Sequence, residues 1–290
     1  MHEARSYHVR PDQPFDLNVT LSSGQAFRWI YDGFWWKGYI ATNVVFIRQD
    51  SNSLFYHGVP EEEIVRYFSL DTDLFEIYDI ISADRFMKQA IKSAQGLRLI
   101  RQDPWSCIAC HICTNRSQRT SAIDRITRIA DILGSPVTFN NEIFSIFPTP
   151  SDILHANSYQ IRDCNLGHSN HLHLVALAEL FVNNPDWLHH LYQIPYSHLI
   201  QALHRIGGVS KSAAEYIAFS AFDALEAFPV DSHIRDLFSL LYLKDRNIRF
   251  SDQQALDHII QQEAREKFGR YAAYAFEYLF VTRDVVKELI

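Results

Sequence analysis

The first sixty residues and the rest of the chain differ in the period of their hydrophobic pattern. From Phe15 to about Gly58, aromatic and β-branched residues form short runs that Gly, Asp and Asn separate. Four of these runs are typical of strands: FDLNVTL, FWWKGYI, NVVFIR and SLFYHG. The spacing of the intervening turns predicts a small antiparallel sheet at the N-terminal end.

From Glu61 onward the pattern is helical. In SAIDRITRIADIL, residues 121–133, the apolar side chains recur every three or four positions and therefore share one face. The same period continues in HLHLVALAELFV, YSHLIQALHRI and DQQALDHIIQQEAREKF, and GRYAAYAFEYLFVTRDVVKEL predicts one long aromatic helix. We therefore predict an α+β chain, in which an N-terminal antiparallel sheet domain precedes a helical domain.

Composition is that of an ordinary globular protein, with 290 residues, 47% of them hydrophobic and 21% charged. No apolar run approaches the ~20 residues of a membrane span. The first residues, MHEARSYHVRPDQ, lack the apolar core of a signal peptide. We expect no membrane partner, and a cytoplasmic, nucleoid-associated or nuclear location.

The net charge of −7 argues at first against a nucleic-acid partner. Its distribution is uneven, however. Residues 61–85 hold eight acidic residues and two arginines, whereas residues 94–130 hold six arginines and two aspartates. Binding to phosphates depends on the surface that faces them, so the acidic total predicts weak non-specific binding and does not exclude DNA.

The stretch CIACHIC, residues 107–113, contains three cysteines and a histidine and suggests a metal or haem site. No second cysteine pair follows to complete a zinc site. A spacing of three residues also keeps small apolar side chains near one helix face, so we favour core packing and expect no metal or cofactor. The histidines of GHSNHLHL are interpreted as exposed or DNA-facing rather than as ligands.

The stretch RIGGVSKSAAEYI, residues 205–217, interrupts two helical patterns with two glycines and a serine. Glycine permits a positive φ and close approach of the backbone to another molecule. The second helix begins at this turn, and the free N–H groups of a helix start suit a phosphate. A purely structural hairpin has the same pattern, and Asp231 in PVDSHIRDLF fits a helix N-cap equally well.

Together, the hairpin and Asp231 resemble the helix-hairpin-helix DNA glycosylases. The segments LSSGQAFRW (21–29), GLRLIRQDPWSCIACHIC (96–113) and GRYAAYAFEYLF (269–280) resemble the 8-oxoguanine DNA glycosylase family in particular. The resemblance implies a sheet domain with linking helices at residues 1–95 and a helical domain at 96–290, whose C-terminal helix lines a base pocket. It also implies a monomer that flips a damaged base out of double-stranded DNA.

The family hairpin carries a lysine that attacks the sugar as a Schiff-base nucleophile. Aligned without a gap through to Asp231, Ser212 takes the place of that lysine, and Lys211 falls one residue early. Adjacent helical side chains diverge by ~100°, so Lys211 should not point where the family's lysine points, although a one-residue shift of the turn would restore it. Ser212 also begins SAAE, a capping-box pattern with Glu215.

The gapless register favours Ser212, and a serine cannot form an imine. Release of the base would then depend on Asp231, whose carboxylate can stabilise an oxocarbenium-like sugar and activate water. The resemblance thus implies an N-glycosylase, and this substitution argues against Schiff-base cleavage of the strand.

The resemblance also locates the base pocket. Phe280 matches a phenylalanine that stacks on the flipped base, while Tyr216 replaces the cysteine on the opposite face. Phe276 replaces the glutamine that reads the Watson–Crick edge, and Gly24 keeps a carbonyl that recognises the oxidised base. The positions matched to DNA contacts are Gly208, Ser210, His233, Arg125, His168 and Asn115.

An aromatic pocket with few donors suits stacking better than hydrogen-bond selection. Two substrate classes therefore fit the sequence: 8-oxoguanine, through Gly24, or a cationic alkylated purine, through cation–π attraction. A non-catalytic module that binds damaged DNA is a third reading, against which the presence of Asp231 argues.

Overall fold

The N-terminal part of the chain forms the predicted antiparallel sheet. The computed structural model describes residues 4–114, 119–244 and 252–290. The sheet has the order β1-β5-β4-β3-β2, and all four strand pairs are antiparallel. Its strands are β1 (Arg5–His8), β2 (Ile30–Tyr31), β3 (Trp36–Ile40), β4 (Asn43–Asp50) and β5 (Ser53–His57). Three of the four predicted strands are confirmed, and the short edge strands β1 and β2 are additional.

The fourth prediction, a strand over FDLNVTL, is wrong, because this segment forms helix α1 (Leu17–Ser22). Asp16 caps the helix, accepting a 2.8 Å hydrogen bond from the backbone N–H of Val19. Leu17, Thr20 and Leu21 are buried. Their helical spacing and the aspartate cap outweigh the β-branched residues of the segment.

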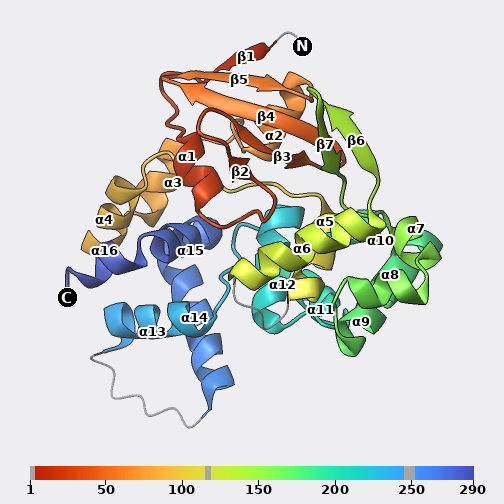
Figure 1. Ribbon diagram of the computed structural model, residues 1–290. Helices are drawn as coiled ribbons and strands as arrows, with labels where there is room; N and C mark the ends of the chain where they lie inside the picture. The colour runs from red at the N-terminus through yellow and green to blue at the C-terminus, as the bar shows by residue number, and fades with distance from the viewer. Residues whose placement is uncertain (1–3, 115–118, 245–251) are drawn as a thin grey trace.

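Helices bury both the sheet and one another (Figure 1). The sheet packs with α2 (Glu61–Tyr67), and the hairpin of β6 (Pro136–Phe139) and β7 (Glu142–Ser145) also packs on it through Phe46. This hairpin was not predicted from the sequence. Helices α3 (Leu74–Ile81) and α4 (Arg85–Ser93) pack in the same hydrophobic core as the C-terminal helices. A 2.8 Å hydrogen bond between the hydroxyls of Tyr78 and Tyr278 joins α3 to the C-terminal region.

The remaining helices form the bundle that the periodicity predicts. They are α5 (Pro104–Thr114), α6 (Arg119–Leu133), α7 (Pro150–His155), α8 (Ser158–Asp163), α9 (His168–Asn183), α10 (Trp187–Gln193), α11 (Tyr196–His204), α12 (Lys211–Phe222), α13 (Ser232–Phe238) and α14 (Gln253–Phe268). The predicted long C-terminal helix is divided into a 3₁₀ turn (Gly269–Tyr271), α15 (Ala272–Val281) and α16 (Arg283–Lys287). In the described part of the chain, no helix combines the length and apolar character that crossing a membrane requires.

Helix α5 runs through the core, which explains the cysteines of CIACHIC. Cys107, Cys110 and Cys113 are all buried in the helical core, as the packing interpretation predicts. Burial raises the pKa of Cys107 and of Cys113 to about 12, so their thiols stay protonated and unreactive at neutral pH.

Two arginines of the basic stretch 94–130 serve the architecture. Arg98 is fully buried and donates hydrogen bonds to the backbone carbonyls of Pro14, Ser69 and Thr72. Arg101 forms ion pairs with two aspartates, Asp71 and Asp223. Both therefore join the sheet region to the helical bundle, and neither is available to a DNA backbone.

Candidate active site

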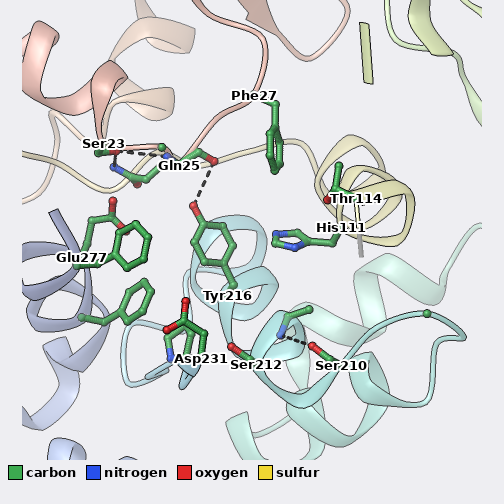
Figure 2. Close-up of a pocket in the computed structure, with 16 residues that line it drawn as sticks. Ser23, Gln25, Phe27, His111, Thr114, Ser210, Ser212, Tyr216, Asp231 and Glu277 are labelled. Atoms are coloured by element: carbon green, nitrogen blue, oxygen red, sulfur yellow. Dashed lines mark hydrogen bonds between the residues drawn. The ribbon is translucent and has the colours of Figure 1, made fainter. Parts of the chain in front are cut away.

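A cavity of about 370 Å³ lies where α5, α12, α15 and the start of α13 meet the loop after α1 (Figure 2). We divide its lining into two walls. The hairpin wall consists of Gly208, Ser210, Ser212, Ala213, Pro229 and Asp231. The α15 wall consists of Ser23, Gly24, Gln25, Phe276, Glu277 and Phe280. Between them lie Phe27, His111, Thr114 and Tyr216.

The hairpin wall begins with the tight turn between α11 and α12. Gly208 has a φ of +84°, and a Cβ added there would meet Nδ1 of His173 at 2.9 Å. Ser210 is the N-cap of α12, and its hydroxyl accepts a 3.1 Å hydrogen bond from the N–H of Ala213. The turn therefore requires glycine, and the cap directs the first turn of α12 at the cavity.

The structure places Ser212 and Lys211 differently. Ser212 is half-buried and lines the cavity, whereas Lys211 is exposed and does not belong to the lining. Because Ser210 is the cap, the capping-box alternative for Ser212 is wrong. Its proposed partner Glu215 is engaged elsewhere, accepting hydrogen bonds from the Tyr196 hydroxyl at 2.5 Å and the Phe228 N–H at 3.0 Å.

Asp231 lines the cavity and also caps α13, with its carboxylate accepting a 2.8 Å hydrogen bond from the N–H of Ile234. The two sequence interpretations of this residue are thus compatible. The segment before it is held by Glu215 of α12, through the bond to Phe228. Burial raises the pKa of Glu215. This buried carboxyl therefore connects α11, α12 and the approach to Asp231.

The α15 wall is fixed by Gln25. Its side chain is almost fully buried, and its amide donates to the Arg98 carbonyl at 2.9 Å and accepts from the Ile100 N–H at 2.8 Å. The preceding Gly24 has a φ of +104°. The Tyr216 hydroxyl then donates to the Gln25 carbonyl at 3.2 Å, across the cavity from α12, as the dashed line in Figure 2 shows.

The aromatic residues predicted for the pocket come together. Phe276 and Phe280 stack with ring centroids 5.8 Å apart and an interplanar angle of 23°. Tyr216 lies edge-on to Phe276, with centroids 6.4 Å apart. Phe276 is only 4% exposed, so most of its ring belongs to the core that underlies the cavity.

His111 of α5 lies against Tyr216, with ring centroids 5.0 Å apart. Burial lowers the pKa of His111 to about 4, so the imidazole is neutral at physiological pH. A neutral imidazole supplies one donor and one acceptor to the cavity.

The predicted DNA contacts are spread around the cavity and beyond it. Gly208 and Ser210 line it, whereas His233 and His168 are exposed at the starts of α13 and α9. Arg125 is half-buried and donates a 2.8 Å hydrogen bond to the Cys113 carbonyl. Asn115 lies outside the described residues.

Sequence reasoning missed several members of the cavity lining, among them His111, Gln25 and Glu277. His111 was considered only as a metal ligand, and Gln25 and Glu277 were not singled out. A signal for Glu277 was present, because it is the one acidic residue of AAYAFEYLFV, an otherwise aromatic and apolar helix. A buried charge in such a helix is rarely there for packing alone.

Comparison with known proteins agrees with this geometry. Residues 8–108 match the sequence model of the 8-oxoguanine DNA glycosylase N-terminal domain. The N-glycosylase/DNA lyase of Arabidopsis thaliana is 24% identical over 285 residues, which cover 91% of this chain and 76% of the plant protein. A probable N-glycosylase/DNA lyase of Methanothermobacter thermautotrophicus is 26% identical, covering 93% of this chain and 94% of the relative.

Among solved structures, the fold matches the Clostridium acetobutylicum 8-oxoguanine glycosylase/lyase with a TM-score of 0.85 and 24% sequence identity, over 98% of each chain. That enzyme was solved in complex with double-stranded DNA containing cytosine opposite 8-oxoguanine. In both sequence and fold, this chain is thus similar to the 8-oxoguanine DNA glycosylases, at identities of 24% to 26%.

Proposed function

We propose that this protein is a DNA repair N-glycosylase that acts as a monomer on double-stranded DNA. It flips a damaged base, 8-oxoguanine or a related modified base, into the cavity and hydrolyses the glycosidic bond. The observation that carries the proposal is the meeting of Asp231 with Gly24 and Phe280 around one cavity, although more than 200 residues separate Gly24 from Asp231 in the sequence. The place of action is the compartment that holds the DNA, nucleoid or nucleus.

The chemistry follows from what lines the hairpin wall. As the bond between the sugar C1′ and the base nitrogen breaks, its electron pair leaves with the base, and positive charge develops on the sugar. The Asp231 carboxylate stabilises that charge and accepts a proton from the water whose oxygen bonds to C1′. The proton balance is completed by protonation of the departing base.

The serine at position 212 argues against cleavage of the DNA strand after the base is released. Cleavage of the strand through an imine needs an amine at the reacting carbon, and a hydroxyl cannot supply one. The exposed side chain of Lys211 lies outside the cavity lining. We therefore propose base release with little coupled strand cleavage, and a phosphate-binding role for Lys211 and for the backbone at Gly208 and Ser210.

A panel of duplexes, each with a single damaged base, tests the proposal. We expect release of free base from at least one oxidised-guanine duplex, with strand breaks appearing only after alkali. Tight binding to the damaged duplex without release of any base would instead identify a non-catalytic damage-binding module.

A further inference from the structure

The five-stranded sheet has an outer face, which points away from α1 and α2, and the β6–β7 hairpin covers only part of it. The inner face packs with α1 and α2 through Val45 and Ile47. Side chains alternate between the two faces of a strand, so Phe46 and Arg48 of β4 lie on the outer face. The hairpin packs on Phe46. The surface around Arg48 stays open, and Phe34 beside it is 60% exposed.

This open patch consists of Phe34, Trp35, Arg48 and Phe55, with Arg48 at its centre. Arg48 pairs with Phe55 of β5, and Trp35 precedes β3 at the position that continues the pairing on the other side. The guanidinium carbon of Arg48 lies over all three rings, at centroid distances of 5.0 Å for Phe34, 5.4 Å for Trp35 and 4.3 Å for Phe55. Cation–π attraction to these rings fixes the position of the guanidinium.

The Arg48 guanidinium has no anionic partner within the part of the chain that the structure describes. It makes no hydrogen bond or ion pair there, and its Nε is buried without an acceptor. A buried donor that lacks an acceptor is destabilising and rare in native proteins. The planar donor fork of arginine matches the two oxygens of a carboxylate. An acceptor from another molecule would therefore complete the patch.

The covered part of the same face shows what kind of segment binds to it. There Lys37 lies over the ring of Phe46, with Nζ 4.9 Å from the centroid. The β6–β7 hairpin supplies Glu142, whose carboxylate accepts a 2.6 Å hydrogen bond from Lys37. It also supplies Phe139 and Phe144, whose ring centroids lie 5.1 and 5.6 Å from that of Phe46. An extended segment with a carboxylate and aromatic rings thus completes a cation and ring on this face.

We propose that the open patch is a docking site for an extended segment of a partner protein that carries a glutamate and a phenylalanine two residues apart. Residues two apart lie on the same side of an extended chain, as Glu142 and Phe144 do in β7. The glutamate accepts two parallel hydrogen bonds from the Arg48 guanidinium, and the phenylalanine packs on the exposed ring of Phe34.

The position of the patch allows the partner and DNA to bind together. The inner face of the sheet packs with α1, and the loop after α1, residues 23–25, lines the cavity. The outer face is therefore turned away from the cavity, and none of the four residues of the open patch belongs to the cavity lining. Arg48→Gln should accordingly leave base release unchanged, so the docking site does not depend on the proposed function.

Fluorescence polarisation with the full chain tests the docking site. The probe is a dye-labelled peptide that repeats Glu-Thr-Phe-Thr, compared with peptides in which Gln replaces each Glu or Ala replaces each Phe. The unaltered protein should bind the first peptide at least ~10-fold more tightly than either of the others. Arg48→Gln should weaken binding of the first peptide by about 10-fold and remove its advantage over the Gln peptide.

Arg85→Gln is the matched control, because the Arg85 guanidinium also lies over a ring, that of Phe86, at 4.8 Å, but on α4. It should bind all three peptides as the unaltered protein does. Equal affinity of the unaltered protein for the Glu and Gln peptides, or no binding of the Glu peptide at ~1 mM, overturns the proposal. This comparison needs no variant, so it decides even if Arg48→Gln does not fold.

Two other occupants of the patch would give different results. A single strand of DNA offers phosphates to Arg48 and bases to the rings. An oligothymidylate that displaces the Glu peptide, binds more tightly than it and loses this affinity in Arg48→Gln would refute a protein segment as the ligand. Sedimentation that shows a dimer of the unaltered protein and a monomer of Arg48→Gln would identify a second copy of this chain as the occupant and would also refute the proposal.

Discussion

The hairpin wall and the α15 wall of the cavity are held in place by different kinds of interaction. The hairpin wall depends on local structure, namely a glycine turn, the Ser210 cap of α12 and the Asp231 cap of α13. The α15 wall depends on long-range contacts, since Gln25 is fixed by Arg98 and Ile100, and by Tyr216 across the cavity. In the proposed function, chemistry belongs to the hairpin wall, which local structure holds, and stacking on the base belongs to the α15 wall, which tertiary packing assembles.

The largest expected effect lies on the hairpin wall. Asp231→Asn should slow base release by on the order of 1,000-fold, because a neutral amide does not stabilise a cationic sugar or accept the proton of water. Folding and duplex affinity should change little, since asparagine is as good an N-cap as aspartate. Single-turnover release and a thermal melt measure the two effects separately.

Asp252→Asn is the matched control for that variant. Asp252 caps α14, its side chain accepts a 2.9 Å hydrogen bond from the Gln254 N–H, and it lies outside the cavity lining. Its replacement should leave base release unchanged. Equal activity of the two variants would reduce Asp231 to a capping residue and would remove the distinction between the walls.

The difference between the walls also explains what could be predicted from the sequence. Residues 205–231 combine a glycine turn, a helix start and an aspartate cap at short range, and these signals are local. The pairing of Gln25 with residues 98–102 leaves no periodic trace, so Gln25 could not be assigned to a cavity in advance.

The errors in the fold predicted from the sequence also arise where the local signal is weak or ambiguous. Helix α1 was predicted as a strand because its β-branched residues were weighted above its cap, and β6 and β7 were missed because each has only four residues. The long amphipathic helices α6 and α14 were predicted well, because a periodic apolar face over 15 or 16 residues is hard to mistake.

The second effect concerns His111, which lies between the walls. Its pKa is lowered to about 4 in the folded protein, whereas in the unfolded chain it is ~6.5. As the pH falls from 7 to 5, the unfolded chain binds the proton and the folded protein does not. The free energy of unfolding should therefore fall by about 2 kcal/mol from this residue alone.

Denaturant unfolding of the unaltered protein and of His111→Phe, each at pH 7 and at pH 5, measures this contribution of His111 to the free energy of unfolding. The phenylalanine keeps an aromatic ring against Tyr216. The variant should lose about 2 kcal/mol less than the unaltered protein over this range. Other groups, such as Glu215 with its raised pKa, are common to both proteins and cancel in the comparison. An equal loss in both proteins would mean that folded and unfolded protein bind the His111 proton equally well, so that burial does not lower the pKa of this histidine.

A third, smaller effect tests the hairpin turn. Gly208→Ala introduces a Cβ at a φ of +84° and 2.9 Å from His173, so it should displace the turn and lower affinity for all duplexes by about 10-fold, or ~1.4 kcal/mol. Gly33→Ala is the control, because Gly33 has a φ of +100° but nothing within 4 Å of the added Cβ. It should lower stability but not DNA affinity. Unchanged affinity in folded Gly208→Ala would make the hairpin a structural connector.

The smallest expected effect belongs to Lys211. Its exposed side chain at the first position of α12 can contribute a point charge toward a phosphate but lies outside the cavity lining. Lys211→Ala should weaken duplex binding a few-fold and lower the salt dependence of binding by about one charge, while single-turnover release changes by less than about threefold. Lys88→Ala, at an exposed position on α4, should change neither quantity.

Borohydride trapping, which captures an imine between a lysine and the sugar, tests whether Lys211 or Ser212 reaches the reacting carbon. The unaltered protein should give no covalent adduct on a duplex that it processes, because Ser212, and not a lysine, lines the cavity beside Asp231. A strong adduct that disappears in Lys211→Ala would show that DNA binding rotates the first turn of α12 and brings the amine to the sugar. The hairpin wall would then be remodelled by its substrate, and chemistry as well as recognition would depend on more than local sequence.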